Sequence, residues 1–489
     1  MSTSLAARRT FIPRARIGPA TSLVVPLVVG AVAFLWQLGA SSLFVDETSS
    51  WRVAAASIGS VFRIDRATEV APPTYYLLLH FWIRALGSDS EWTMRLFSVL
   101  AGIGLVAAVW WLARIVAGNT AAFLAALITA LSPLVVEYAQ EVRAYVFAML
   151  CVTIAVAAAI RSTHSSDHRT RWVAVSAAAS VAAIWLHYTG LLVILPLAVF
   201  VWMSESLSVS AKRAYILVCA AGLLIVSPLM VIQLRAGHQG GVAPYAQPTL
   251  TNLLRVVGSP FDGRFAPLVV AYLTGALAVA FAVLVSALSP QTRRLPDRRL
   301  VLAAAVTPLV AVVGINIAAK LFDERTYYSL ITRYTAVAVP FMIVTLAWTL
   351  VAIPRPAGVG LAGVLIVSIV SGLHATYSSQ TLQPNMHAAV ARIVRGYRAG
   401  DTVVLTGAVA HSFDPDYYVA SLRTQRPQAV IVRTAGTSVA VPSAGTRIWV
   451  VFDTGSATPV AAALSRAGWH TVQTAGLDPD VELVLARHG

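Results

Sequence analysis

Residues 44–51 read Phe-Val-Asp-Glu-Thr-Ser-Ser-Trp and place two adjacent carboxylates just after the first long apolar run of the chain. A carboxylate is costly inside hydrocarbon and stable in water, so Asp46 and Glu47 are expected at the edge of a membrane. At that edge, a carboxylate can meet a substrate whose head is polar and whose tail is a lipid. The pair is therefore the first candidate for a reactive centre.

The composition is that of a polytopic membrane protein. Of 489 residues, 57% are apolar and 12% are charged, and the mean hydropathy is +0.74. An ordinary soluble protein has about a quarter of its residues charged. The net charge of +15 does not indicate nucleic acid, because the arginines are dispersed between apolar runs rather than gathered on one polar face. We expect a lipid bilayer as the partner, and no nucleic acid.

Apolar runs long enough to cross a bilayer recur along the membrane half of the chain. A window of about 19 residues finds about eleven of them. They lie near residues 21–40, 93–116, 119–136, 142–160, 172–186, 188–204, 213–234, 266–288, 300–320, 333–353 and 357–377. The two runs beside His187 are also compatible with one re-entrant hairpin. The sequence therefore predicts a polytopic α-helical membrane domain over residues 21–378.

The amino terminus resembles a signal peptide, because four arginines precede the first apolar run. That run is long enough to span a bilayer, so we expect an uncleaved first helix after a tail over residues 1–20; cleavage after Ala40 is the alternative. The two cysteines, Cys151 and Cys219, lie inside predicted spans. We therefore expect neither a disulfide framework nor a metal site built from thiolates.

Loops rich in Lys and Arg predict which helix ends face the cytoplasm. With the amino terminus inside, the basic clusters of the cytoplasmic side lie at residues 8–16, 161–171, 212–213, 293–299 and 355. Nearly every acidic residue of the membrane half then lies outside, although acids influence translocation little and a neutral placement is the alternative. We expect a multi-pass protein of a bacterial-type plasma membrane, with a cytoplasmic amino terminus and an extracytoplasmic reactive centre.

Two segments that are expected outside the membrane are too polar to cross it. The first, residues 41–92, has apolar residues at helical spacing over Thr48–Ile64 and Thr74–Leu86, which predicts two interfacial helices with a corner at Pro72-Pro73. They would position the carboxylate pair and cover a substrate head. The second, residues 235–265, contains polar residues suited to a phosphate or a metal, although they are also typical of a solvated loop.

The carboxyl-terminal segment, residues 379–489, has a different pattern and is expected outside the membrane. Short strands are predicted over Thr402–Thr406, Ala429–Arg433, Arg447–Phe452 and Val481–Leu485. Helices are predicted between them over Met386–Arg398, Pro415–Thr424 and Pro459–Ala467. This alternation predicts a small α/β domain. It has no Gly-rich phosphate loop and no nucleophile elbow, so we expect it to support the membrane domain or to contact an acceptor.

Several motifs follow one another in a defined order. These are Asp46-Glu47 after the first run, Pro-Pro-Thr-Tyr-Tyr-Leu-Leu-Leu-His at 72–80, Tyr-Ala-Gln-Glu-Val-Arg-Ala-Tyr at 138–145, His187-Tyr188, and Thr332-Arg333-Tyr334 with Pro340. This order resembles the GT-C superfamily of lipid-linked-sugar glycosyltransferases. It is most similar to the family-39 and aminoarabinose-transferase-like branch, which includes protein O-mannosyltransferases and bacterial cell-envelope enzymes. The resemblance covers roughly residues 20–355.

The resemblance implies a fold and a reaction. The fold is a GT-C type bundle, and the reaction transfers a sugar, with inversion, from a polyprenyl monophosphate to a hydroxyl on the outer face. The acceptor would be a glycolipid, a polysaccharide or a protein of the cell envelope. In such a transfer, a base must take the proton of the acceptor hydroxyl, and cations must stabilise the negative charge on the departing phosphate. The sequence does not identify the sugar.

Each candidate residue also has a simpler explanation. Asp46 is the candidate base, or else a helix cap. Glu47 would orient the acceptor or bind a metal, or else is a first-turn acid that the helix dipole stabilises. Glu141 and Arg143 would contact the substrate, or else form a structural ion pair. Arg333 with Tyr334 would hold the phosphate, or else anchor a helix at the interface.

The remaining candidates are expected around the same outer face. His187 and Tyr188 would contact the acceptor, although a histidine here is more often buried and hydrogen-bonded. Tyr75 and Tyr76, like Trp51, would stack on sugar faces, or else belong to an interfacial aromatic belt. Arg235 is a further phosphate candidate. No cofactor is firmly implied, but a divalent metal would use Glu69 and His238, with Glu69 also a substrate contact. The family's usual motifs are incomplete here, because Ala71 replaces a frequent histidine and no Glu-Lys-Pro occurs.

Two other functional classes remain to be weighed. A transporter or lipid flippase usually keeps ionisable or helix-breaking groups near the middle of the membrane. In this chain the middles of the apolar runs are almost free of charge, and the acids gather at one face. A non-catalytic envelope scaffold would tolerate Asp46→Asn with only a small change in stability.

Overall fold

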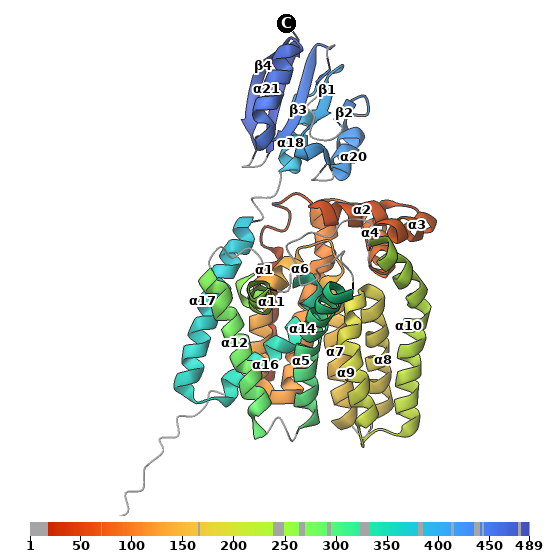
Figure 1. Cartoon of the computed structure of the whole chain (residues 1–489), viewed down its shortest axis with the longest axis vertical. Coiled ribbons are helices and arrows are strands. Elements are labelled where there is room, and N and C mark those ends of the chain that lie inside the picture. The colour runs from red at the N-terminus through yellow and green to blue at the C-terminus, as the bar shows by residue number, and fades with distance from the viewer. Residues whose placement is uncertain are drawn as a thin grey trace, which may run out of the picture.

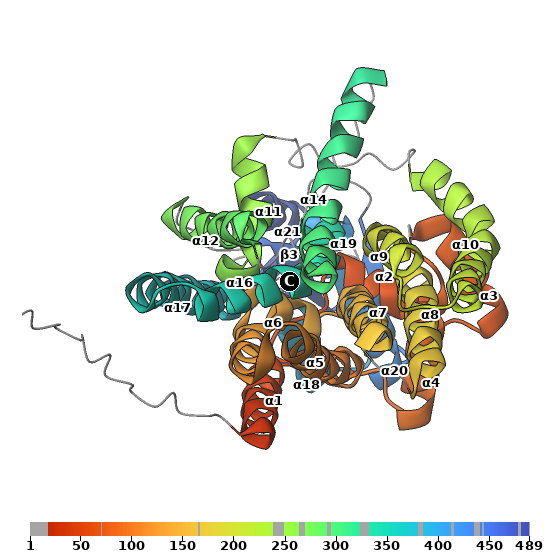
Figure 2. The ribbon, with the colours of Figure 1, turned by 90° about the horizontal axis from the view of Figure 1, so that it is seen from below.

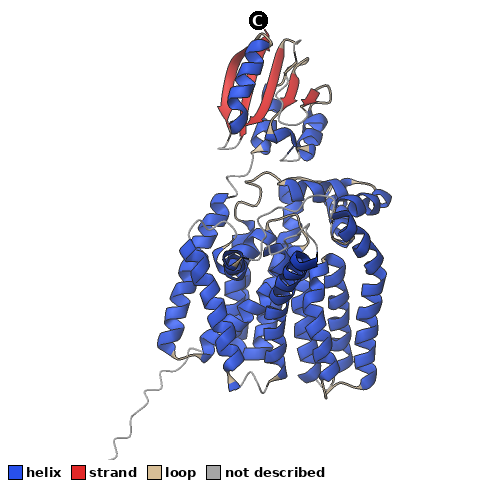
Figure 3. Cartoon of the chain, viewed as in Figure 1, coloured by secondary structure: helices blue, strands red, loops and turns tan. Residues whose placement is uncertain are grey.

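The structure is a computed structural model. It describes residues 18–488 apart from residues 70, 165–166, 238–248, 264–268, 291–294, 323–331, 380–384, 412–414, 435–440, 443–444 and 478–480. The chain forms a helical bundle with a small mixed domain above one end (Figure 1, Figure 3). The mainly helical fold and the small carboxyl-terminal sheet domain were both predicted from the sequence.

Each of the expected apolar runs coincides with a helix. The bundle helices are α1 (Pro19–Leu35), α5 (Glu91–Leu131), α6 (Pro133–Ala139), α7 (Tyr145–His164), α8 (Arg169–Leu186), α9 (Leu191–Met203), α10 (Val209–Gly237), α11 (Leu250–Asp262), α12 (Val269–Leu288), α14 (Pro296–Phe322), α16 (Val339–Ala352) and α17 (Arg355–Ser379). The two expected runs within α5 meet at Gly118, whose positive φ of 82° breaks the helix there. Glycine adopts this conformation without the steric cost that a side chain would add.

The described helices fit a multi-pass membrane protein. Among them, six are long and apolar enough to cross a bilayer by length and composition. Many large apolar side chains point away from the protein, among them Leu217 and Leu224 of α10 and Val359 of α17. In water such a surface would be unfavourable, whereas lipid tails are its natural neighbours.

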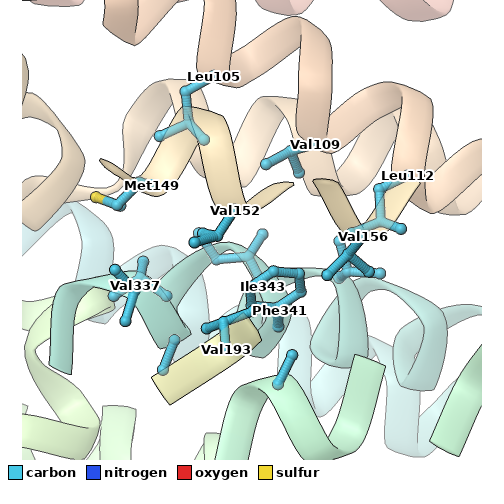
Figure 4. Close-up of a cluster of buried hydrophobic side chains, with 14 of the residues drawn as sticks. Leu105, Val109, Leu112, Met149, Val152, Val156, Val193, Val337, Phe341 and Ile343 are labelled. Atoms are coloured by element: carbon cyan, nitrogen blue, oxygen red, sulfur yellow. The ribbon is translucent and has the colours of Figure 1, made fainter. Parts of the chain in front are cut away.

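The core of the bundle lies between α5, α7 and α16, which occupy the middle of the view in Figure 2. Leu105 and Val109 of α5 meet Val152 of α7, and Phe341 and Ile343 of α16 close the cluster (Figure 4). Alanine and valine predominate in this core, so the helix backbones can approach closely. This packed centre supports the helix ends nearest the carboxyl-terminal domain, where the polar residues gather (Figure 1).

Three short helices lie across one end of the bundle (Figure 1). They are α2 (Val45–Ala55), α3 (Ile58–Thr68) and α4 (Thr74–Leu86). The single helix expected over Thr48–Ile64 was therefore wrong, because extended backbone at Ala56 and Ser57 separates α2 from α3. The predicted corner at Pro72-Pro73 precedes α4, as expected.

The carboxyl-terminal domain contains a five-stranded sheet in the order β2-β1-β3-β5-β4. Its strands are β1 (Thr402–Leu405), β2 (Val430–Arg433), β3 (Arg447–Asp453), β4 (Trp469–Gly476) and β5 (Val481–His488). Strands β2, β1 and β3 are parallel, and β5 is antiparallel to β3 and β4. The main helices are α18 (Met386–Gly396), α20 (Asp416–Gln425) and α21 (Ala457–Arg466). Strand β4 was missing from the prediction.

The carboxyl-terminal domain docks on α2 and on the start of α5. The Tyr418 hydroxyl donates a hydrogen bond to the Glu91 carboxylate and accepts one from the amide of Leu43 at 2.7 Å. His387 contacts Glu91 at 3.0 Å, and Arg52 of α2 pairs with Asp416 of α20 at 2.7 Å. The helix that carries Asp46 therefore also carries contacts to the carboxyl-terminal domain.

Candidate active site

Asp46 lies in the first turn of α2, where its carboxylate meets Arg333. The Arg333 guanidinium Nη1 is 2.6 Å from Asp46 Oδ2, although 287 residues separate the two in sequence. Their side chains are 31% and 29% exposed, so the pair is accessible from outside the protein. A paired guanidinium stabilises the ionised carboxylate, which is the form that accepts a proton.

Arg143 lies beside this pair and joins two outer helices. Its Nη1 is 3.2 Å from the backbone oxygen of Asp46, from Ser50 Oγ and from Glu69 Oε2. The Glu69 carboxylate also accepts hydrogen bonds from the hydroxyls of Ser49 at 2.5 Å and Tyr76 at 2.9 Å. The sequence predicted Glu69, Tyr76 and Arg143 as site residues, and the structure brings all three to the Asp46 helix.

Glu47 occupies a different environment from its neighbour. Its carboxylate forms a two-pronged pair with Arg95, at 3.0 Å to Nε and 2.7 Å to Nη2, and the side chains are only 1% and 4% exposed. It also accepts from the amides of Val142 and Phe44. These contacts surround the carboxylate and hold it in place between Arg95 and two backbone amides. Its other predicted role, as a first-turn acid of a helix, agrees with this geometry.

Other predicted residues lie around the two arginines. Glu141 is buried and is close enough to Arg333 to interact with it electrostatically. His187 packs against Tyr145 with ring centroids 5.1 Å apart, and its Nδ1 accepts from the amide of Thr189. Burial, together with the nearby Arg143 and Arg333, lowers the pKa of His187 to about 3. The imidazole is therefore neutral at physiological pH, as expected next to two cations.

Tyr75 and Tyr76 are more buried than a sugar-stacking platform requires, whereas Tyr334, predicted beside the phosphate, is half-buried. Tyr75 and Tyr76 belong to an apolar cluster beneath the outer helices and are almost fully buried. Neither of those two rings has an exposed face, while the Tyr76 hydroxyl contacts Glu69. Tyr334 packs against a small cluster formed by Val256 and Val312. Tyr75 and Tyr76 therefore support the site from its buried side and offer no ring face to a sugar.

A second polar network, which the sequence did not predict, lies beside the first. Gln233 near the end of α10 donates to Asp65 Oδ2 and to the backbone oxygen of Ala71, both at 2.8 Å. It accepts from the Tyr188 hydroxyl at 2.5 Å. Burial, with a further contribution from Glu69, raises the pKa of Asp65 to about 8. The sequence feature that could have indicated this network is the polar amide of Gln233 inside an apolar run.

The predicted metal pair is only partly covered by the structure. Within the described part of the chain, no three His, Cys, Asp or Glu side chains gather as a metal would require. Glu69 is engaged by Ser49, Tyr76 and Arg143, whereas His238 and the side chain of Arg235 lie outside the described residues. A metal bound by Glu69 and His238 stays a prediction, as does a phosphate contact by Arg235.

Comparison with known proteins finds a family model that matches part of the chain. A model of the dolichyl-phosphate-mannose-protein mannosyltransferase family matches residues 70–232. This match begins after α2 and α3 and extends from α4 to α10, so it does not include Asp46. The match spans about a third of the chain, and over that part the sequence is similar to this family.

Two solved membrane-protein structures share the architecture across nearly the whole chain. ArnT from Cupriavidus metallidurans, solved bound to undecaprenyl phosphate, is 14% identical, with a TM-score of 0.57 over 95% of this chain and 97% of that one. The oligosaccharyltransferase AglB from Archaeoglobus fulgidus, in complex with an inhibitory peptide and a dolichol-phosphate, is 11% identical, with a TM-score of 0.51 over 94% and 73%. No curated protein sequence matches this chain. These matches show that the fold of this chain is that of the two solved proteins.

Proposed function

We propose that the protein is a glycosyltransferase, which moves a sugar from a polyprenyl monophosphate to a hydroxyl of a cell-envelope acceptor, with inversion at the anomeric carbon. The observation that carries the proposal is the accessible Asp46–Arg333 pair, which joins a base and a cation within 2.6 Å at the outer helices. The reaction needs both charges, one at the attacking oxygen and one at the leaving oxygen.

Asp46 is the general base in this mechanism. The acceptor hydroxyl attacks the anomeric carbon and forms the new carbon–oxygen bond while its proton passes to the Asp46 carboxylate. The bond between that carbon and the phosphate oxygen breaks in the same displacement. Because attack and departure occur on opposite faces of the sugar ring, the configuration at the anomeric carbon inverts.

Arg333 and Arg143 receive the departing phosphate. A guanidinium donates two parallel hydrogen bonds to neighbouring phosphate oxygens, which suits a dianionic leaving group. Arg333 exchanges its contact with Asp46 for the phosphate when the donor binds, and this exchange frees the carboxylate for the acceptor. Glu69 and Ser50 hold Arg143 beside the same position.

The proposal has support from the similar structures. The ArnT structure was solved with undecaprenyl phosphate, and the AglB structure with a dolichol-phosphate. Both ligands carry a phosphate on a long isoprenoid. A donor of this kind is held at the membrane surface by its own tail, so the protein needs to bind only the polar head.

A donor panel tests the reaction. Purified protein in proteoliposomes is given polyprenyl monophosphates that carry labelled mannose, arabinofuranose, aminoarabinose or galactose, together with envelope extracts as acceptors. We expect one donor to give a labelled product of inverted configuration. Absence of transfer from all of them, with folded protein, contradicts the proposal.

The outer location is tested separately. Ser57→Cys lies at the exposed break between α2 and α3, and Ser208→Cys lies before α10. We expect a membrane-impermeant maleimide to label the first variant in intact cells and the second only after lysis. The reverse pattern contradicts an extracytoplasmic site.

A further inference from the structure

A polar cleft with two aromatic side chains lies between α2 and α20, in the seam between the bundle and the carboxyl-terminal domain. Its volume is about 430 Å³, including the part that opens to solvent, and it is lined by Trp51, Asp89, Tyr417, Ala420, Ser421, Thr424 and Gln425. Asp46 and Ser50 of α2 contact the site arginines, whereas Trp51 contacts Asp89 and Tyr417. The cleft is therefore separate from the Asp46 site.

The two aromatic rings are held in fixed orientations. The ring centroids of Trp51 and Tyr417 are 5.3 Å apart with an angle of 84° between the planes, so an edge meets a face. The Trp51 indole donates to Asp89 Oδ2 at 2.9 Å, and the Tyr417 hydroxyl donates to the backbone oxygen of Asp89 at 3.3 Å. Both rings remain half-exposed. Rigid, partly exposed rings offer apolar contact area at a low entropic cost.

Hydroxyl and amide groups complete the lining. Ser421, Thr424 and Gln425 lie three and four positions apart on α20, so they share one face of that helix. With the Asp89 carboxylate they provide both donors and acceptors. None of the described lining residues is Lys, Arg or His. This chemistry suits an uncharged ligand with many hydroxyls and an apolar C–H face, and it does not suit a phosphate or an acidic lipid.

We infer that this cleft binds sugar residues of the acceptor, and that the acceptor is a glycan chain. This inference rests on the proposed function, in which a sugar is transferred to an acceptor. Asp46 and Trp51 are five positions apart on α2, which is about 7.5 Å along the helix axis. A saccharide of several units can occupy the cleft while its terminal hydroxyl reaches Asp46. The carboxyl-terminal domain thereby contributes to acceptor choice.

Binding without donor tests the inference. The full-length protein in nanodiscs is titrated with neutral hexasaccharides of hexoses or pentoses, and with a Ser/Thr-rich peptide, by saturation-transfer NMR. We expect one saccharide series to bind the wild type and Glu482→Gln, a distant carboxylate of β5, equally. Gln425→Ala is expected to weaken binding about fivefold, as for one lost hydrogen bond. Thr424→Trp, which fills the cleft from an exposed position, is expected to abolish binding, whereas the exposed neighbour Arg423→Ala leaves it unchanged.

The outcomes separate the two proposals. Wild-type protein that binds no saccharide, binds only the peptide, or binds saccharides that Thr424→Trp does not displace overturns the cleft assignment. Wild-type protein that binds saccharide in the cleft but transfers no sugar from any polyprenyl phosphate overturns the proposed function alone.

Discussion

Substitutions of the two adjacent carboxylates of α2 are predicted to have different effects on folding stability. Glu47→Gln keeps the shape of the side chain but leaves the Arg95 guanidinium buried without a counter-ion. Breaking a buried pair in this way costs roughly 3–5 kcal/mol of folding stability, and the amides of Val142 and Phe44 lose a charged acceptor as well. Asp46→Asn removes a pair whose members are about one-third exposed, so its cost is about 0–1 kcal/mol.

The assay compares thermal unfolding in detergent with transfer activity for both variants. We expect a melting temperature clearly below the wild type for Glu47→Gln and close to it for Asp46→Asn. The double variant Glu47→Gln with Arg95→Met is expected to lose less stability than the sum of the single changes, because no unpaired charge remains. Glu47→Gln with wild-type stability and no activity would refute the reasoning, since it would make Glu47 a chemical participant.

Three further predictions follow from the ionisable groups. Arg333→Lys is expected to lower transfer strongly without unfolding the protein, because an ammonium cannot fork onto two phosphate oxygens; retention of the wild-type rate contradicts the phosphate role. Burial raises the pKa of Asp65 from 3.8 to about 8, so the folded state keeps a proton that the unfolded state loses, and stability should fall as pH rises through that window. Asp65→Asn should remove this slope in melting temperature, and parallel slopes in the two proteins contradict it. Hydrogen bonding to Glu91 raises the pKa of His387, so docking of α18 should be full below about pH 6.5 and weaken as pH rises through the raised value. The protection factor of the α18 amides, which corrects for base-catalysed intrinsic exchange, is expected to fall at high pH in the wild type but not in His387→Gln.

Much of the bundle could be predicted because every lipid-crossing helix must be apolar along its length. The break between α2 and α3 could not, because Ala56 and Ser57 carry no Pro or Gly signal. We attribute the break to tertiary contact, since α3 turns toward α10 and brings Asp65 to Gln233. Strand β4 was missed because most of its residues are exposed and a bulge between Thr471 and Gln473 interrupts the alternation.

The sequence predicted which residues belong to the site but not which of them contact one another. The motif order drew attention to Asp46, Glu69, Arg143 and Arg333. Nothing in local sequence indicates that Arg333 meets Asp46 across 287 positions. Arg95, which is buried against Glu47, and Gln233 were overlooked because each was counted as part of an apolar run. A lone polar group in such a run has to find a partner, and that requirement is the signal to use.

The most direct measurement is the initial rate of labelled-sugar transfer from a polyprenyl phosphate donor by Asp46→Asn in proteoliposomes. Glu482→Gln, a carboxylate of the carboxyl-terminal sheet, is the matched control. If Asp46 is the general base, its loss lowers the rate by about a hundredfold or more, while the melting temperature and donor binding stay close to those of the wild type. A well-folded Asp46→Asn variant that transfers sugar at the rate of the control would contradict the account.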